Sequence, residues 1–270
     1  AVSDNGRAYR RPVDAGFVEI TGFTSGFADV YAAPNGAVFM VSTPRTTRTC
    51  LSNCTTAAAF TDYMLPTSNL TVTALCGDSS TNVFAVGKRD LAGVGVLYRW
   101  NGTSWYVLSG SLGMNNPTSC YLRADGALFI AGEKEILRWQ NGGATIETAG
   151  LDLSILGTDA MAPGWNGIHG IGNQVIAIGN KRRSLIRDPA NGTWSLGSNP
   201  QGATNLMHAI AFVTPNEILA AGFKDPNVLW ASDGGTVFTA TTPDLPVANS
   251  IRKILVLGPD EVYFGGGAPS

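Results

Sequence analysis

The sequence is poor in charged residues, histidine and cysteine. Its 270 residues include 18 Lys and Arg, 20 Asp and Glu, two His and four Cys. The formal net charge of −2 excludes the strongly basic surface that general nucleic-acid binding requires. No apolar run reaches the roughly 18 residues of a membrane helix, so we expect no membrane span. The first residues, Ala-Val-Ser-Asp, are compatible with removal of a secretory signal.

Recognisable catalytic motifs are also missing. The sequence has no Gly-x-Ser-x-Gly nucleophile motif and no phosphate-binding loop. Its two histidines, His169 and His208, form no metal-ligand pair at helical spacing. We therefore expect no resident metal or cofactor, and we favour a function without catalysis.

The chain is instead rich in turns and short apolar segments. It contains 33 Gly and 14 Pro, and 44% of its residues are hydrophobic. A disordered chain would combine low hydrophobicity with high net charge, and this chain shows neither. No amphipathic helical stretch of useful length interrupts the pattern. These features predict an all-β fold with many tight turns.

A strand pattern repeats six times along the sequence. Apolar strands recur at residues 38–42, 83–87, 128–132, 175–179, 218–222 and 262–266, so successive copies begin 43 to 47 residues apart. Turn-forming residues precede these strands, as in Pro34-Asn-Gly36 and Pro215-Asn-Glu217. A third and a fourth strand follow in most copies. Six such copies predict a six-bladed β-propeller with four-stranded blades.

The two ends of the sequence complement one another. The sixth copy stops at Ser270, after its second strand, and residues 7–20 align with the third and fourth strands at 96–108. We predict a single domain over residues 1–270, in which N-terminal strands at about 7–21 complete the blade begun at about 251–266. Two strands from each end would close the ring without an open sheet edge.

The repeat also resembles a known group of proteins. Asn-Val-Phe-Ala-Val-Gly at 82–87, followed by Leu-Tyr-Arg-Trp-Asn-Gly-Thr-Ser-Trp at 97–105, is similar to the tandem propeller repeats of secreted bacterial proteins of the myxobacterial type. Ala-Ser-Asp-Gly-Gly-Thr-Val-Phe at 231–238 resembles the Asp-box turn of sialidase-type propellers. The resemblance implies a secreted or cell-surface location and lectin-like or adhesive roles, without specifying an activity.

The four cysteines fall into two pairs. Cys50 and Cys54 are close enough in sequence to predict a local disulfide, and with it an oxidising, extracellular compartment. Cys76 and Cys120 are assigned, with His169, to equivalent positions in the innermost strands of consecutive copies. This pattern is compatible with a Cys76–Cys120 disulfide, with a metal site and with apolar packing of free thiols.

Arginine recurs in the predicted third strands, at Arg10, Arg99, Arg138 and Arg187. Such a row could form one ligand site per blade, or each arginine could pair with a neighbouring strand. Trp165 and Asn166 lie instead in the longest connection between copies, residues 150–167. A loop of this length can be functional, which places both residues in the candidate site, or it can simply cap a blade.

Charge separates the two faces of the predicted propeller. The loops between second and third strands carry nine cations and four acids, and three acids in the blade-to-blade loops reduce the excess to about +2. The turns on the opposite face are acidic, which the turn preference of Asp explains. The candidate ligand-binding residues on the basic face are Arg45, Arg48, Lys88, Arg89, Trp165, Asn166, Lys181, Arg182, Arg183 and Lys224.

Three functions are compatible with this sequence. The first is a secreted or surface-exposed binding module, lectin-like or adhesive, that presents its basic face to a glycan or protein. The second is a sialidase- or lyase-like enzyme using Asp29, Arg252 and Lys253, although glycoside hydrolysis requires two facing carboxyl groups. The third is a structural subunit of a surface assembly that associates with copies of itself.

Overall fold

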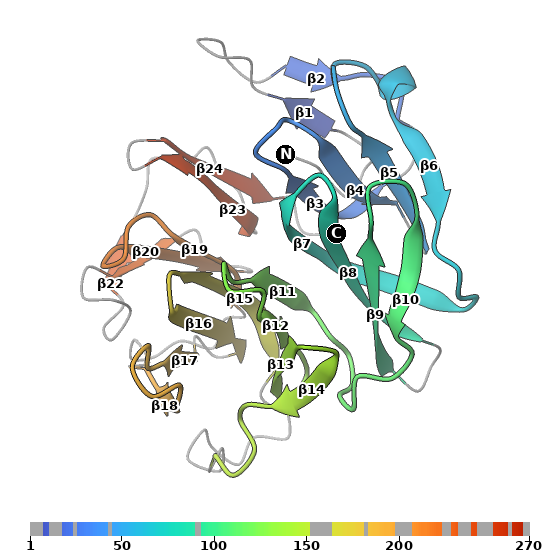
Figure 1. Ribbon diagram of the computed structural model, residues 1–270. Coiled ribbons are helices and arrows are strands. Elements are labelled where there is room, and N and C mark those ends of the chain that lie inside the picture. The colour runs from blue at the N-terminus through green and yellow to red at the C-terminus, as the bar shows by residue number, and fades with distance from the viewer. Residues whose placement is uncertain are drawn as a thin grey trace. The chain divides into compact units, whose positions relative to one another are not determined.

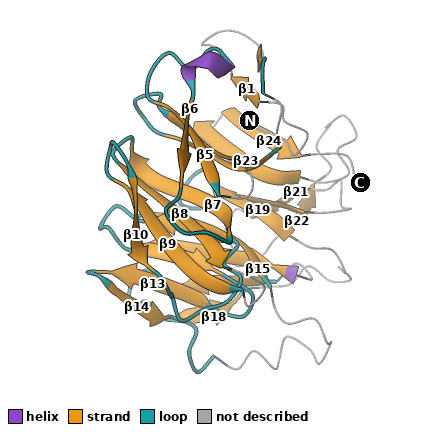
Figure 2. Ribbon diagram, turned by 90° about the vertical axis from the view of Figure 1, so that its right-hand side faces the viewer, coloured by secondary structure: helices purple, strands orange, loops and turns teal. Residues whose placement is uncertain are grey.

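The computed structural model describes residues 8–10, 18–23, 26–42, 45–89, 93–151, 164–180, 183–197, 207–222, 228–231, 239–241, 251–258 and 261–266. β-strands supply nearly all the regular structure of these residues (Figure 2). The chain separates into two compact units, Ala1–Pro117 (unit 1) and Thr118–Ser270 (unit 2), which are described in turn. None of the described helices is long and apolar enough to cross a membrane.

Unit 1 contains one two-stranded and two four-stranded antiparallel sheets (Figure 1). The two-stranded sheet pairs β1 (Ala8–Arg10) with β2 (Val18–Ile20). The first four-stranded sheet contains β3 (Phe27–Ala32), β4 (Val38–Ser42), β5 (Thr46–Cys50) and β6 (Thr61–Met64), with the short 3-10 helix η1 (Ala57–Ala59) before β6. The second contains β7 (Leu70–Ser79), β8 (Asn82–Arg89), β9 (Val94–Trp100) and β10 (Trp105–Ser109).

Unit 2 repeats this arrangement. It has three four-stranded antiparallel sheets. The first contains β11 (Ser119–Leu122), β12 (Leu128–Ala131), β13 (Ile136–Gln140) and β14 (Gly143–Ile146), and the second contains β15 (Trp165–Ile171), β16 (Gln174–Gly179), β17 (Ser184–Arg187) and β18 (Trp194–Leu196). The third contains β19 (Met207–Phe212), β20 (Ile218–Gly222), β21 (Val228–Ala231) and β22 (Thr239–Thr241). A two-stranded sheet pairs β23 (Ile251–Gly258) with β24 (Glu261–Gly266).

The sheets confirm the predicted all-β class and the four-stranded repeat. Each four-stranded sheet pairs its strands in sequence order, which is the arrangement of a propeller blade. The six apolar strands predicted from the repeat correspond to β4, β8, β12, β16, β20 and β24. The local periodicity of the sequence therefore specifies the sheets.

Aromatic side chains fill the space between the two four-stranded sheets of unit 1. The ring centroid of Phe39 on β4 lies 5.9 Å from that of Trp100 and 6.4 Å from that of Trp105. Tyr63 on β6 lies 4.8 Å from Trp100. Unit 2 repeats the contact between Phe129 and Trp194, at 6.4 Å. The recurrent tryptophans therefore occupy packing positions between sheets.

The hairpin turns repeat as closely as the strands. In the turn after β3, Gly36 donates to the carbonyl of Ala33 at 2.9 Å and adopts a φ of +84°. Gly126 makes the same bond to Arg123 at the same φ in the turn after β11. Only glycine adopts this left-handed conformation readily, so these two positions explain part of the high glycine content.

Side chains at or next to the first strands of the sheets donate hydrogen bonds to main-chain carbonyls farther along the same unit. The hydroxyl of Thr73 donates to the carbonyl of Pro117 at 2.7 Å, and that of Thr118 donates to the carbonyl of Trp165. The amide of Asn166 donates to the carbonyl of Met207 at 2.9 Å. The last two bonds join neighbouring sheets of unit 2, and we call them the inter-sheet latches.

Candidate binding surface

Three of the predicted basic-face residues adjoin one connection of unit 1, although the consecutive side chains of Lys88 and Arg89 point to opposite faces of their sheet. Lys88 and Arg89 end strand β8, opposite Thr71 and Leu70 of β7, rather than lying in the loop that follows. Arg45 precedes β5, and its carbonyl accepts a hydrogen bond from Leu65 at 3.0 Å. Arg45 and the end of β8 therefore both adjoin the connection between β6 and β7, residues 65–69.

Thr67 of this connection and Arg89 both influence Tyr98 on β9. Burial raises the pKa of the Tyr98 phenol, whereas Thr67 and the positive charge of Arg89 lower it. Thr67 belongs to the connection that begins at Leu65, whose amide binds Arg45. We call Arg45, Thr67, Lys88 and Arg89 the unit 1 patch.

A folded segment supports the cationic end of β8. Residues 112–116 run beside the β8–β9 hairpin: Gly95 donates to Met114 at 2.9 Å, and Asn116 donates to Gly93 at 2.8 Å. The ammonium group of Lys88 donates to Oδ1 of Asn116 at 3.3 Å. Sequence reasoning missed Asn116 and Thr67, because neither belongs to a repeated position. The patch therefore has a fixed framework rather than a free loop.

Arg48 has a different environment from the rest of the predicted set. It lies in the middle of β5, directly opposite Asp62 of β6, and its Nε is 3.0 Å from the Asp62 carboxylate. Its guanidinium carbon also lies 5.3 Å from the ring centroid of Phe23. Arg48 therefore connects strands within its own sheet, and the prediction that it lies in a loop was wrong.

Arg183, just before β17, is the described basic residue of unit 2 that belongs to the candidate set. Burial lowers the pKa of its guanidinium, and its backbone amide donates to Asn180 at 3.3 Å. Asn180 in turn donates its amide to Gly164 at 3.0 Å, which fixes this turn beside β15. Lys181, Arg182 and Lys224 lie outside the described residues.

Trp165 and Asn166 belong to the start of strand β15 rather than to a long connection. Trp165 is fully buried in the core between the sheets of unit 2. Asn166 forms an inter-sheet latch to Met207 and a second bond to Asn180, at 3.0 Å. A bulge between Trp165 and Gly167 directs the Asn166 side chain out of the regular alternation. Both residues therefore have packing or hydrogen-bonding partners inside unit 2.

The strand register shows that the arginines predicted at one repeat position do not all occupy it. Arg99 and Arg138 lie opposite Phe84 and Phe129, as an equivalent pair should. Arg187 lies opposite Val175, the position that Trp100 holds opposite Val83. Its assignment to the row was wrong by one residue, because the turn after it, 188–193, is longer than the corresponding turn at 101–104.

Arg187 occupies the core position that a tryptophan holds in the sheet β7–β10, and its guanidinium belongs to a nearly buried ion-pair network. Its Nε lies 2.9 Å from Oε2 of Glu147, and Nε of Arg138 lies 2.7 Å from Oε1. The indole of Trp194 donates to Oε2 at 3.1 Å. The Glu147 side chain is only 7% exposed, so both carboxylate oxygens are bound where water is largely excluded. The guanidinium of Arg187 also stacks on Phe129 at 5.3 Å.

A shallow depression of about 540 Å³ lies above this network in unit 2. It is lined by Thr145, Ile146, Glu147, Ala149, Gly150, Leu151, Gly192, Thr193 and Trp194. The lining carboxylate, Glu147, already binds two guanidinium groups and an indole. The depression therefore offers mainly hydroxyl and apolar groups, and it contains none of the predicted site residues.

The strand register also shows that the predicted equivalence of Cys76, Cys120 and His169 was wrong at Cys120. Cys76 pairs with Phe84, His169 pairs with Ile176, and the residue that pairs with Phe129 is Tyr121 rather than Cys120. A bulge between Gly77 and Ser79 shifts the count by one. Tyr121, not Cys120, is therefore the equivalent of His169.

His169 is held between aromatic rings of the neighbouring strands. Its ring centroid lies 5.3 Å from that of Tyr121 and 6.0 Å from that of Phe212. The Phe212 amide donates to Nδ1 of His169 at 3.4 Å. Burial and the positive charge of Lys253 lower the pKa of His169 to about 4, so the imidazole is neutral at pH 7. Its role in unit 2 is aromatic packing.

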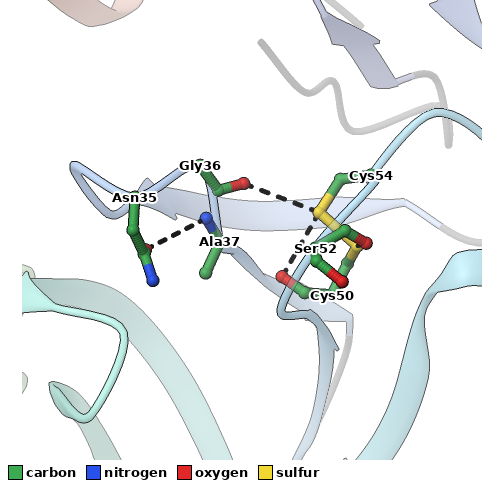
Figure 3. The surroundings of a disulfide bond; sticks show 6 residues. All are labelled: Asn35, Gly36, Ala37, Cys50, Ser52 and Cys54. Atoms are coloured by element: carbon green, nitrogen blue, oxygen red, sulfur yellow. Dashed lines mark hydrogen bonds between the residues drawn. A yellow bond between two sulfur atoms is a disulfide. The ribbon is translucent and has the colours of Figure 1, made fainter.

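The disulfide prediction is confirmed at Cys50 and Cys54 (Figure 3). Their Cα atoms are 5.7 Å apart, within the normal range. The Cys54 sulfur, which carries no hydrogen in the disulfide, lies 3.6 Å from the carbonyl oxygen of Gly36, so the closed loop lies against the turn after β3. Cys76 and Cys120 are also disulfide-bonded, and no cysteine is free. Both therefore lack the thiol that metal binding would require.

No other described group resembles a metal centre. Among the residues that the structure describes, no three His, Cys, Asp or Glu side chains lie close enough together to hold an ion. The unit 1 patch and the Arg183 turn are thus the described parts of the predicted basic surface, and their chemistry is that of cations and neutral hydrogen-bonding groups.

Comparisons with known proteins identify the fold. No protein-family model and no curated protein matches the chain. It is similar to the solved structure of YCF48 bound to D1 peptide, with a TM-score of 0.64 and 18% identity over 98% of this chain and 87% of that one. U3-55K gives a TM-score of 0.66 at 9% identity, over 98% and 79% of the two chains.

A third similar structure is the extracellular domain of BT4673 from B. thetaiotaomicron. Its TM-score is 0.66 at 10% identity, and the match covers 98% of this chain but 37% of that one. At these identities the likeness shows the fold alone. It supports the propeller-like class over nearly the whole length of the chain.

Proposed function

We propose that this protein is a non-catalytic binding module whose ligand is an acidic segment of another protein. The observation that carries the proposal is the unit 1 patch, in which Arg45, Lys88 and Arg89 adjoin one connection on a fixed framework. Cations grouped on a rigid surface attract carboxylates and orient their approach. The structural likeness to a peptide-bound protein supports a peptide ligand.

The architecture we propose for this module is a single six-bladed propeller over residues 1–270. Its last blade would contain β23 and β24 together with the N-terminal strands β1 and β2. Each of these pairs forms a two-stranded sheet, which is half of a blade. In a closed ring, the loops between second and third strands share one face, so Arg183, Lys181, Arg182 and Lys224 would extend the unit 1 patch.

We further propose an extracellular location. All four cysteines are in disulfides, and disulfides persist in oxidising compartments. An extracellular binding module also encounters glycans, so an acidic glycan is the second ligand class to test.

The test compares two double variants that change the net charge equally. Lys88→Ala/Arg89→Ala removes two positive charges from the patch. Ala124→Glu/Asn173→Glu adds two negative charges at exposed turns of unit 2. Both bring the net charge from −2 to −4. Binding is measured on a library of acidic, neutral and basic peptides and on a glycan array.

We expect acidic peptides to bind the unaltered protein. The patch variant should weaken that binding at least tenfold, about 1.4 kcal/mol, and the control should leave it unchanged. Equal weakening by both variants would show a net-charge effect and contradict the patch. Binding confined to glycans would contradict the peptide ligand.

A further inference from the structure

Strand β10 is an outer edge of unit 1 that lacks the usual protection against pairing. It is the last strand of the sheet β7–β10 (Figure 1). An edge strand presents backbone amides and carbonyls that no neighbour in its own sheet can bind. Natural proteins protect such edges with charged residues, proline or very short strands.

The sequence of β10 has none of these features. Its residues are Trp-Tyr-Val-Leu-Ser, all favourable or tolerated in strands, and Tyr106 and Val107 are 36% and 44% exposed. With five residues it is longer than the other described outer strands, which contain three or four. A bulge between Val107 and Ser109 follows the regular part of the strand.

The sequence that contains β10 is uncharged over a much longer stretch, although Arg99 of β9 lies opposite Tyr106. Residues 101–122 contain no Asp, Glu, Lys or Arg, in a chain with 14% charged residues. Of the other described outer strands, β2 and β6 carry Glu19 and Asp62, whereas β14, β18 and β22 are uncharged but shorter than β10. The uncharged stretch limits the partners that β10 can recognise by electrostatics, and it removes repulsion between two copies of the strand.

We propose that β10 pairs with β10 of a second copy of this chain. Antiparallel pairing about a two-fold axis makes every residue face the symmetry mate of another residue in the same strand. A charge near the axis would therefore meet its like, and the uncharged strand avoids this.

The side chains of β10 suit this symmetric pairing. When the axis is centred on Tyr106, Tyr106 faces its own mate and Trp105 faces Val107. Aromatic–aromatic and aromatic–β-branched pairs are among the favourable cross-strand pairs. The association joins two four-stranded sheets edge to edge and leaves the unit 1 patch on a different strand end.

The interface is small, so the dimer forms only at high protein concentration. A single strand pair buries less area than the roughly 1,200 Å² of a stable complex, and a dissociation constant in the micromolar to millimolar range follows. Sedimentation velocity on the complete chain between about 1 µM and about 1 mM therefore measures the equilibrium directly.

Lysine at the edge tests the proposal. Tyr106→Lys places two like charges directly opposite each other at the two-fold axis, and it should raise the dimer dissociation constant at least tenfold. Val107→Lys places them at diagonal positions across the axis and replaces the pairing of Val107 with Trp105, so it should also weaken the dimer. Thr145→Lys is the control, because Thr145 on β14 faces Arg138 of β13 as Tyr106 on β10 faces Arg99 of β9. It adds the same charge to the equivalent outer strand and should leave dimerisation unchanged. Far-ultraviolet circular dichroism of each variant verifies folding.

Three results would overturn the proposal. One is a monomer over the whole concentration range. Another is a dimer that persists in both β10 variants. The last is an equal loss of dimer in Thr145→Lys, which would show a general effect of added charge.

Discussion

Single residues in this protein reveal how a repeated position can accept an unusual side chain. Arg187 takes the place of a tryptophan and stacks on Phe129, as Trp100 packs against Phe39. A guanidinium in that place needs an anion, and Glu147 supplies it. Exchange of an indole for a cation therefore required a compensating residue on the neighbouring sheet.

Removal of the Glu147 charge should destabilise unit 2 strongly. Glu147→Gln leaves the guanidinium groups of Arg138 and Arg187 without a counter-ion in a nearly buried site. Breaking such a pair typically lowers the free energy of unfolding by about 3–5 kcal/mol. Denaturant titration measures the change. In Asp125→Asn, which breaks an ion pair whose carboxylate is 45% exposed, we expect about 0–1 kcal/mol; similar losses in both variants would contradict the role of burial.

His169 should make stability depend on pH on the acidic side of neutrality. Its folded-state pKa of about 4 lies below the ordinary 6.5, so the unfolded chain binds the proton more readily. The contribution of His169 is complete above pH 6.5 and decreases as the pH falls toward 4, by at most about 1.4 kcal/mol per pH unit.

The measurement is the free energy of unfolding of matched variants between pH 7 and pH 4. His169→Phe retains an aromatic ring between Tyr121 and Phe212 and should lose this component of the slope. His208→Phe leaves His169 in place and should retain it. Identical pH profiles for the two variants would show that His169 does not cause the dependence.

At the scale of strands and sheets, the sequence predicts the positions of the repeated strands well. It predicts poorly the bulges and long turns that interrupt the repeat. Six apolar strands were located because their spacing is regular and their turns contain Gly, Pro and Asn. Bulges were not visible, since a bulge adds one residue without changing composition. The repeat therefore aligns Cys120 where the structure has Tyr121, and it predicts a loop at Trp165 and Asn166 where the structure has the start of β15.

The candidate surface was predictable only in part for the same reason. Loop position was inferred from charge, but Lys88 and Arg89 extend β8 and Arg48 faces Asp62 inside a sheet. Asn116 and Thr67 do not lie at repeated positions of the sequence. They come near the cationic residues of the unit 1 patch only because the chain packs in this way. Such contacts depend on tertiary structure and have no local sequence pattern.

Loss of one inter-sheet latch should weaken the contact between two sheets. Asn166→Ala removes the bond to the Met207 carbonyl and should lower the free energy of unfolding by about 1–3 kcal/mol, because a partly buried acceptor loses its partner. Asn173→Ala, at an exposed turn of the same sheet, should change it by less than about 0.5 kcal/mol. Denaturation curves decide between these values. An unchanged stability in Asn166→Ala would leave ligand contact as the role of this residue.

For the whole molecule, the proposed closure makes the N-terminal strands essential. Deletion of residues 1–21 would remove β1 and β2, and in a closed ring this leaves β23 and β24 as half a blade. Exposed strand edges favour association between chains. We expect a lower thermal midpoint and concentration-dependent aggregation in light scattering, with a shortened control that lacks only residues 1–6 behaving like the complete chain. A deletion variant that unfolds at the original temperature would contradict this closure.

The inter-sheet latches have a consequence for how such a chain can grow. In each, the donor belongs to the earlier sheet and the acceptor to the next one along the chain, as in Thr118 to Trp165 and Asn166 to Met207. Because the acceptor is a main-chain carbonyl, any successor sheet provides it whatever its side chains are. A gene duplication that copies one repeat therefore brings its own donor and finds a ready acceptor. Repeat number can change in evolution without a matched pair of new mutations, and sequence in the loops is free to diversify.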